Sequence, residues 1–116
     1  MRKNDKKIDN ALRRGLTDIC EQALKDYDGF QWLTHTVDYH RFPKSLKIIV
    51  VFDNQSHITQ FTSAQQHLGL ENAIELMLSK LQINLKSVKQ HILLDCEADC
   101  ALQHSGNWQA RLKTSS

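Results

Sequence analysis

The chain has 116 residues, of which 41% are hydrophobic and 24% are charged, an ordinary globular composition that excludes wholesale disorder. A chain of this length buries enough apolar surface to fold without a metal or a disulfide, so we expect one domain over residues 1–116 and no cofactor. The formal net charge of +2 is too small to indicate a nucleic-acid or acidic partner by itself.

The sequence favours a cytoplasmic protein that does not contact a membrane. Its longest apolar run, Ile48 to Phe52, is far shorter than a membrane span. The N-terminus has the positive charge of a signal peptide but lacks the apolar segment that should follow. Three cysteines, an odd and low number, suit a reducing compartment better than a disulfide framework.

The segment from Asn4 to Tyr27 has the apolar spacing of a long amphipathic helix, because its apolar residues recur at steps of three and four. Asn4 or Asp5 is suited to cap its start, and Asp28-Gly29 ends it because glycine tolerates the left-handed conformation of a helix exit. The predicted stripe consists of Ile8, Leu12, Leu16 and Ile19, together with Ala11, Cys20, Ala23, Leu24 and Tyr27.

Two strands are predicted next. Phe30 to Tyr39 is rich in aromatic and β-branched residues. Leu46 to Phe52 ends in five consecutive apolar residues, which indicates burial on both faces and a central place in the sheet. The short connection holds the only proline, Pro43, and favours an antiparallel pairing of the two strands.

We expect two helices after the polar run that begins at Asp53. The first stops or kinks at Gly69, and the second extends from Leu70 to Leu81 with a clear apolar stripe. The residues that should face inward on the first helix are Ile58, Phe61, Ala64 and Leu68.

The last third of the chain contains a predicted third strand, within Val88 to Asp95. A short helix from Glu97 to His104 ends at Gly106, and Trp108 to Leu112 forms a last short strand or an extended tail. This order of elements favours an α+β fold, in which the long N-terminal helix and further helices pack on a mainly antiparallel sheet of three to four strands.

The basic residues of the N-terminal helix are the first candidate site. The first 14 residues hold six basic residues against two acidic ones, so this end carries +4 and the rest of the chain carries −2. The candidate docking residues are Lys6, Lys7, Arg13 and Arg14, which fall opposite the apolar stripe. Such a face suits a phosphate backbone or an acidic protein, and it is also typical of a solvated outer surface. No aromatic residue is interleaved to contact bases.

A second candidate is the run of Cys96, Cys100 and His104. On a helix these residues lie one above another, so two thiolates and an imidazole could meet one soft metal ion, with His91 or Asp95 as a fourth ligand. The same spacing is that of an inward-facing stripe, in which cysteine acts as a small hydrophobic residue. A second Cys/His pair with zinc-finger spacing is absent, so we assign no metal to the run.

Acidic residues at the predicted strand ends form a third candidate. Asp53 follows the central strand, and Asp95, Glu97 and Asp99 follow the third. Carboxylates at neighbouring strand ends could hold Mg²⁺ for phosphoryl or nucleotide chemistry. The alternative is that they cap the helices that come next. The residues available as an acid, a base or an electrostatic stabiliser are Lys47, His91 and His104.

Three stretches resemble a small family of uncharacterised gammaproteobacterial proteins. They are Met1-Arg-Lys-Asn-Asp-Lys-Lys-Ile-Asp-Asn-Ala-Leu12, Phe30-Gln-Trp-Leu-Thr-His35 and Asp95-Cys-Glu-Ala-Asp-Cys-Ala-Leu-Gln-His-Ser-Gly-Asn-Trp108. Some members are labelled Fis-family transcriptional regulators, so the resemblance implies a bacterial, cytoplasmic protein that binds DNA. Because two consecutive helices are not expected after residue 88, no helix-turn-helix residue is carried over.

Together these features favour a non-enzymatic regulatory or interaction module. We expect it to dock a protein or a nucleic acid through the basic face of the N-terminal helix. The alternative function is a small metal-dependent enzyme that uses the acidic residues at the strand ends. The sequence leaves open whether the chain forms a homodimer.

Overall fold

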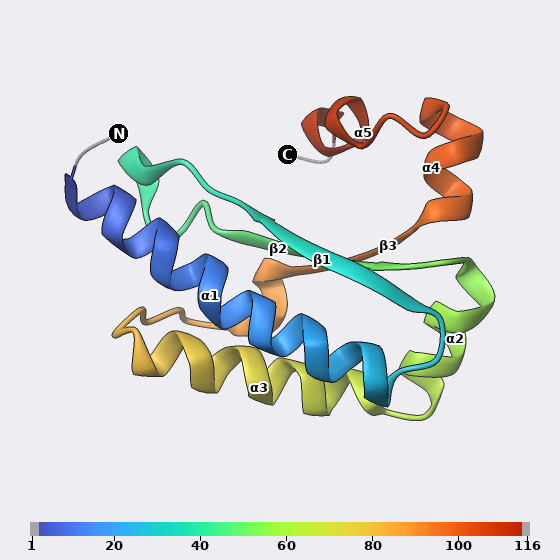
Figure 1. Ribbon diagram of the computed structural model, residues 1–116, viewed down its shortest axis with the longest axis horizontal. Coiled ribbons are helices and arrows are strands. Elements are labelled where there is room, and N and C mark those ends of the chain that lie inside the picture. The colour runs from blue at the N-terminus through green and yellow to red at the C-terminus, as the bar shows by residue number, and fades with distance from the viewer. Residues whose placement is uncertain (1–2, 115–116) are drawn as a thin grey trace.

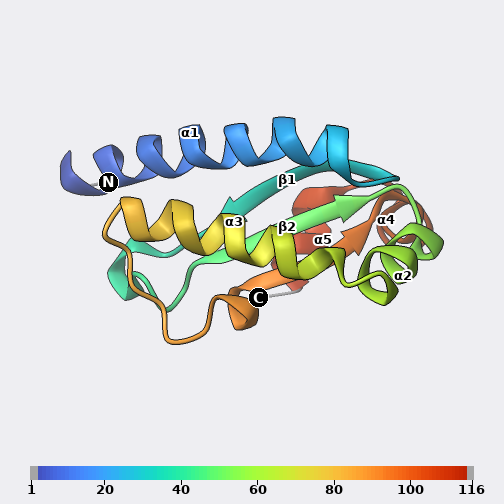
Figure 2. The ribbon, with the colours of Figure 1, turned by 90° about the horizontal axis from the view of Figure 1, so that it is seen from below.

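A three-stranded sheet lies at the centre of the computed structural model, which describes residues 3–114 (Figures 1 and 2). The strands are β1 (Phe30–Thr36), β2 (Lys47–Phe52) and β3 (Ile92–Cys96). The helices are α1 (Lys3–Asp26), α2 (Gln55–Ser63), α3 (Gln66–Lys80), α4 (Glu97–His104) and α5 (Trp108–Thr114). Short 3-10 turns occupy Tyr39–Arg41 and Val88–His91. Among the described residues, no helix is long and apolar enough to cross a membrane.

The sheet is mixed, and the expected α+β class is confirmed with three strands. The order is β1-β2-β3: β1 pairs antiparallel with β2, as predicted, whereas β2 and β3 pair in parallel. A parallel pair needs a long crossover connection, and α2 and α3 supply it. The central position predicted for β2 is also confirmed, because Ile48 to Phe52 are all buried.

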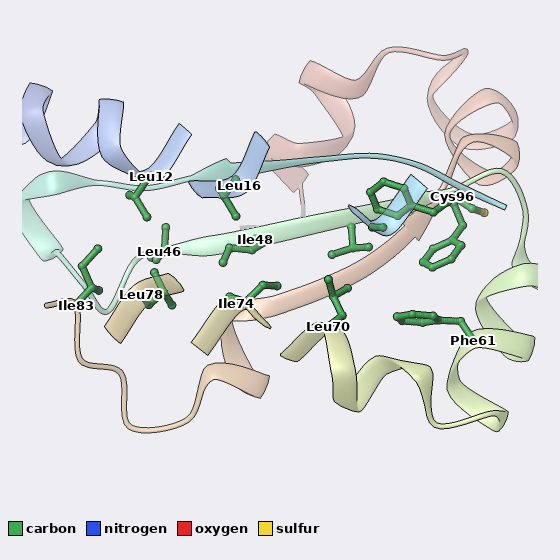
Figure 3. Close-up of a cluster of buried hydrophobic side chains, with 14 residues drawn as sticks. Leu12, Leu16, Leu46, Ile48, Phe61, Leu70, Ile74, Leu78, Ile83 and Cys96 are labelled. Carbon is green, nitrogen blue, oxygen red and sulfur yellow. The ribbon is translucent and has the colours of Figure 1, made fainter. Parts of the chain in front are cut away.

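The core lies between the sheet and the two long helices, α1 and α3, which lie side by side on one face (Figure 2). From α1, Leu12 and Leu16 point toward the sheet, and from α3, Ile74 and Leu78 do the same (Figure 3). They meet alternate residues of β2, of which Ile48 is one. The amphipathic stripe predicted for the N-terminal helix therefore builds the main core.

The ends of α1 differ in how well they were predicted. Asn4 and Asp5, the expected caps, lie inside the helix. At the other end Gly29 takes the expected left-handed conformation, with φ +82°, and a Cβ there would lie 2.3 Å from the ring of His57. Leu24 was predicted to face the core but is 55% exposed.

The break between α2 and α3 was predicted at the wrong residue. It occurs at Gln65, which adopts a left-handed conformation with φ 59°, and α3 continues through Gly69. A glycine within a helix costs only about 1 kcal/mol, which tertiary packing offsets. As a result Ala64 and Leu68, expected to face inward, are exposed.

The predicted last strand or extended tail is wrong: Trp108–Thr114 is the helix α5. The bounds predicted for α4 are confirmed. Two consecutive helices therefore follow β3, whereas the sequence predicted only one. The backbone N–H of Ala110 donates to Oδ1 of Asn107, so this side chain caps α5 by accepting from one of the free N–H groups of its first turn. The predicted first strand also extended too far, because it ends at Thr36 and a 3-10 turn capped by Asp38 follows.

Candidate functional site

A groove of about 630 Å³ runs between the outer surfaces of α1 and α3. We call it the α1–α3 groove. The two helices run antiparallel, so the N-terminal half of α1 lies beside the C-terminal half of α3 (Figure 2). The groove is lined by Ala11, Arg14, Gly15, Asp18 and Ile19 from α1, and by Asn72, Ala73, Leu76, Met77, Lys80 and Leu81 from α3 and the turn after it.

The floor of the α1–α3 groove is apolar because most of its lining residues are, and its two helices approach closely there. At Gly15 a Cβ would lie 2.6 Å from Cγ of Met77, so the Met77 side chain would have to shift to accommodate a larger residue. Beyond this contact Leu76 is 59% exposed and adds apolar surface to the groove. Exposed apolar surface that lines a groove is typical of a protein-binding site.

The rim of the α1–α3 groove carries more positive than negative charge. Arg14 and Lys80 line it, against one acidic residue, Asp18. Within residues 3–114, neither Arg14 nor Lys80 has a salt-bridge partner. Both cations are therefore available to an incoming negative group.

The four candidate docking residues do not form one continuous face. Lys6 and Lys7 are exposed, as predicted for a docking surface. Arg14 lines the α1–α3 groove, whereas Arg13 lies on the side of α1 nearer β1. Its Nε donates at 2.8 Å to Asp9, one turn earlier in the same helix. Lys80, which shares the groove with Arg14, was not predicted, because the pairing of α1 with α3 is not visible in local spacing.

Asp9 is the centre of a polar cluster that the sequence did not reveal. Its side chain is 12% exposed and accepts hydrogen bonds from Arg13 and from the Tyr39 hydroxyl at 2.7 Å, while Nε2 of His35 lies 3.1 Å away. Burial alone would raise the pKa of Asp9, but the hydrogen bonds from Tyr39, Arg13 and His35 outweigh burial and lower it to about 2. Burial and the same carboxylate raise the pKa of Tyr39.

The acidic residues of the alternative enzyme each have a partner within the chain. Asp95 accepts two hydrogen bonds from Arg111, at 2.6 and 2.8 Å. Glu97 accepts from the indole N–H groups of Trp32 at 2.6 Å and Trp108 at 3.0 Å. These contacts attach α5 to the face of the sheet opposite α1.

The third acidic residue, Asp53, lies 2.6 Å from Nδ1 of His57 at the carboxyl end of β2. It also accepts a hydrogen bond from the backbone N–H of Asn54. This pair is separate from the Asp95–Arg111 ion pair. Asp53 is therefore engaged in a local contact next to the start of α2.

The cysteines of the second candidate site are buried. Burial raises the pKa of both Cys96 and Cys100, which disfavours the thiolates that a metal would need. In residues 3–114, the one group of potential ligands whose atoms all lie within 4.8 Å is Asp95, Cys96 and Asp99. Cys100 and His104 do not belong to it, so the predicted set is not brought together.

Comparison with known proteins adds no family to this description. No family model matches the chain, and no curated protein or solved structure is significantly similar to it. The function has to be inferred from the surface of the described residues.

Proposed function

We propose that the protein is an interaction module that binds an acidic, amphipathic helix of a partner protein in the α1–α3 groove. The observation that carries the proposal is an apolar groove with Arg14 and Lys80 on its rim, neither of which has a salt-bridge partner among residues 3–114. An amphipathic helix inserts its apolar side chains into such a groove and leaves its charged ones at the rim.

The chemistry of the groove favours a protein over a nucleic acid. A phosphate backbone is held by many cations and gains little from an apolar floor. Here Leu76 and Met77 supply that floor, and Asp18 on the rim would repel phosphates. Acidic side chains of a helix can instead contact Arg14 and Lys80 and avoid Asp18.

The first test is a titration with a synthetic amphipathic helix that has leucines on one face and glutamates on the other. We expect the labelled peptide to bind by fluorescence anisotropy and to shift the amide signals of Ala11, Gly15 and Ala73 in NMR spectra. Its affinity should fall with added salt, because rim charges contribute to it. A peptide with lysines in place of the glutamates should bind more weakly.

Paired variants locate the binding site. Arg14→Glu should lower the affinity by about tenfold or more, whereas Lys44→Glu, the same charge change on an exposed loop residue, should leave it unchanged. Leu76→Ser should weaken binding, whereas Leu102→Ser should not, although Leu102 is also exposed. Equal effects within either pair would contradict the proposal.

A titration with a nucleic acid tests the other docking hypothesis, in which the basic face of α1 binds a phosphate backbone. If duplex DNA binds more tightly than the acidic peptide at the same salt concentration, and if Leu76→Ser leaves that binding unchanged, the protein-binding proposal is wrong. Loss of DNA binding on replacing Lys6 and Lys7 with glutamine would then favour the basic face of α1 as a phosphate contact.

A further inference from the structure

The outer edge of β1 has an irregular register with β2 between Phe30 and Trp32, but its pairing is regular from Trp32 to Thr36. Within the described residues β1 pairs with β2 on one side only. Natural proteins protect such edges with charged residues or proline, because a free row of backbone N–H and C=O groups recruits another strand. None of the seven residues of β1, Phe30-Gln-Trp-Leu-Thr-His-Thr36, is a proline, lysine, arginine or acidic residue. This edge is therefore suited to pair with a further strand.

A second groove follows this edge. It has a volume of about 790 Å³ and lies between β1 and α1, which runs alongside the strand (Figures 1 and 2). Five successive residues, 33–37, line it. Because alternate side chains of a strand point to opposite faces, a groove that contacts five residues in a row follows the strand edge. We call it the edge groove.

The helical wall of the edge groove carries three charged side chains, Asp9, Arg13 and Glu21, of which Asp9 and Arg13 are paired with each other. Arg13 and Glu21 both line it and are eight residues apart, about 12 Å along the helix. The Arg13 side chain is 70% exposed and contacts Asp9 through Nε, which leaves its terminal nitrogens for another acceptor. In the described chain Glu21 has no salt-bridge partner.

Between Arg13 and Glu21 the wall is weakly polar. Thr17 and Cys20 line the edge groove there, and Leu24, one turn beyond Cys20, is 55% exposed. A two-fold axis near Thr17 would place Arg13 of one chain opposite Glu21 of another, and the reverse. Apart from Asp9, which already contacts Arg13, the charges of the wall are therefore complementary to themselves across this axis.

We propose that two copies of the chain associate through β1 and α1. The two β1 strands pair antiparallel about a two-fold axis and join the three-stranded sheets into one of six strands. The two α1 helices lie antiparallel across the same axis, with Arg13 facing Glu21 of the partner chain and the reverse. A second copy is favoured over a foreign strand because it gives Glu21 a cation and, at the same time, gives the terminal nitrogens of Arg13 a second acceptor.

Sedimentation equilibrium over a concentration and salt series tests this dimer. We expect a mass that approaches twice 13.4 kDa as the protein concentration rises. High salt should weaken the association, because the two predicted ion pairs are at the surface. A protein that stays monomeric at millimolar concentration and low salt would overturn the proposal.

Charge variants test the arrangement of the helices. Glu21→Arg should weaken dimerisation about tenfold or more, because it places two like charges opposite each other. Glu75→Arg, the same change at an exposed position on α3, should have no effect. The double variant Arg13→Glu with Glu21→Arg should restore the dimer, since the wall is again complementary to itself.

A third variant covers the case in which Arg13→Glu disturbs the fold through its contact with Asp9. Leu24→Lys should also dissociate the dimer, and circular dichroism should show an unchanged helix content. If the protein dimerises but neither Glu21→Arg nor Leu24→Lys lowers the association constant, the dimer uses another surface and the proposal is wrong.

Discussion

At the scale of single residues, Asp9 connects parts of the chain that are far apart in sequence. Its carboxylate holds α1 to β1 through His35 and to the following 3-10 turn through Tyr39. Because Asp9 lies on the inner side of α1, its charge has to be satisfied by these partners and not by water. The cluster fixes the position of α1 relative to the edge of the sheet.

We predict that Asp9→Asn destabilises the protein in a pH-dependent way. The pKa of Asp9 is about 2 in the folded protein and near its ordinary value of 3.8 in the unfolded chain. The ionised group therefore contributes about 2 kcal/mol above pH 4, and this contribution is lost as the pH falls from 4 to 2. Urea denaturation at a series of pH values measures the difference between the two proteins.

The control for this prediction is Asp18→Asn, which removes an exposed carboxylate from the same helix. Its free energy of unfolding should stay within about 0.5 kcal/mol of the parent at every pH. A difference between Asp9→Asn and the parent that does not shrink toward pH 2 would show that the Asp9 charge is not what stabilises the fold.

The Asp9 cluster could not be predicted from local patterns. Its partners His35 and Tyr39 follow at 26 and 30 residues, so no helical or strand spacing connects them. The one available signal was an aspartate within three residues of Leu12 on the inner side of an amphipathic helix. The four basic docking residues were visible because their spacing is local, but the placement of Arg13 and Arg14 in two different grooves was not.

At the scale of elements, the contact between α1 and α3 depends on Gly15. Gly15→Ala should gain about 1 kcal/mol of helix propensity, but the new Cβ would lie 2.6 Å from Cγ of Met77. We therefore predict no gain in stability in the parent protein and a gain of about 1 kcal/mol in the Met77→Ala background. A double-mutant cycle by urea denaturation measures this, and equal effects in both backgrounds would contradict it.

The attachment of α5 depends on the ion pair between Arg111 and Asp95. Both side chains are largely buried, so Arg111→Met leaves a carboxylate without its partner and should cost about 3 kcal/mol. Adding Asp95→Asn should recover part of this loss, because the uncompensated charge is then removed. Chemical denaturation gives the free energies, and hydrogen exchange should show faster exchange in α5.

A matched control is the exposed pair of Arg41 and Asp38, whose atoms are 3.7 Å apart. Arg41→Met should change the free energy of unfolding by less than about 1 kcal/mol, since exposed ion pairs contribute little. If Arg111→Met is equally mild, the Asp95–Arg111 pair is not what holds α5 on the sheet.

The elements that the sequence predicted well are those whose burial follows from periodicity. The bounds predicted for α1 from its apolar stripe, and for β2 from its apolar run, lie within one residue of those in the structure. The helix α5 was missed because its anchors, Trp108 and Arg111, act through Glu97 and Asp95, which belong to other elements. The break at Gln65 was missed because glutamine is not a usual residue for a left-handed conformation.

At the scale of the whole molecule, α1 separates the two proposed surfaces. The α1–α3 groove lies on its α3 side and the edge groove on its β1 side, and the two share no lining residue. The inner side of α1 is held by the core and by Asp9. A ligand in either groove therefore has no direct contact with the other groove.

This separation predicts that peptide binding and dimerisation are thermodynamically independent. A ligand shifts an equilibrium only if it interacts differently with the two states, and the rim of the α1–α3 groove is the same in the monomer and in the dimer that we propose. Saturating acidic peptide should thus leave the dimer dissociation constant unchanged. Likewise Glu21→Arg should leave peptide affinity unchanged, and Arg14→Glu should not alter dimerisation. Sedimentation equilibrium with and without peptide measures the coupling, and a shift of tenfold or more, about 1.4 kcal/mol, would mean that α1 transmits a change between its two sides.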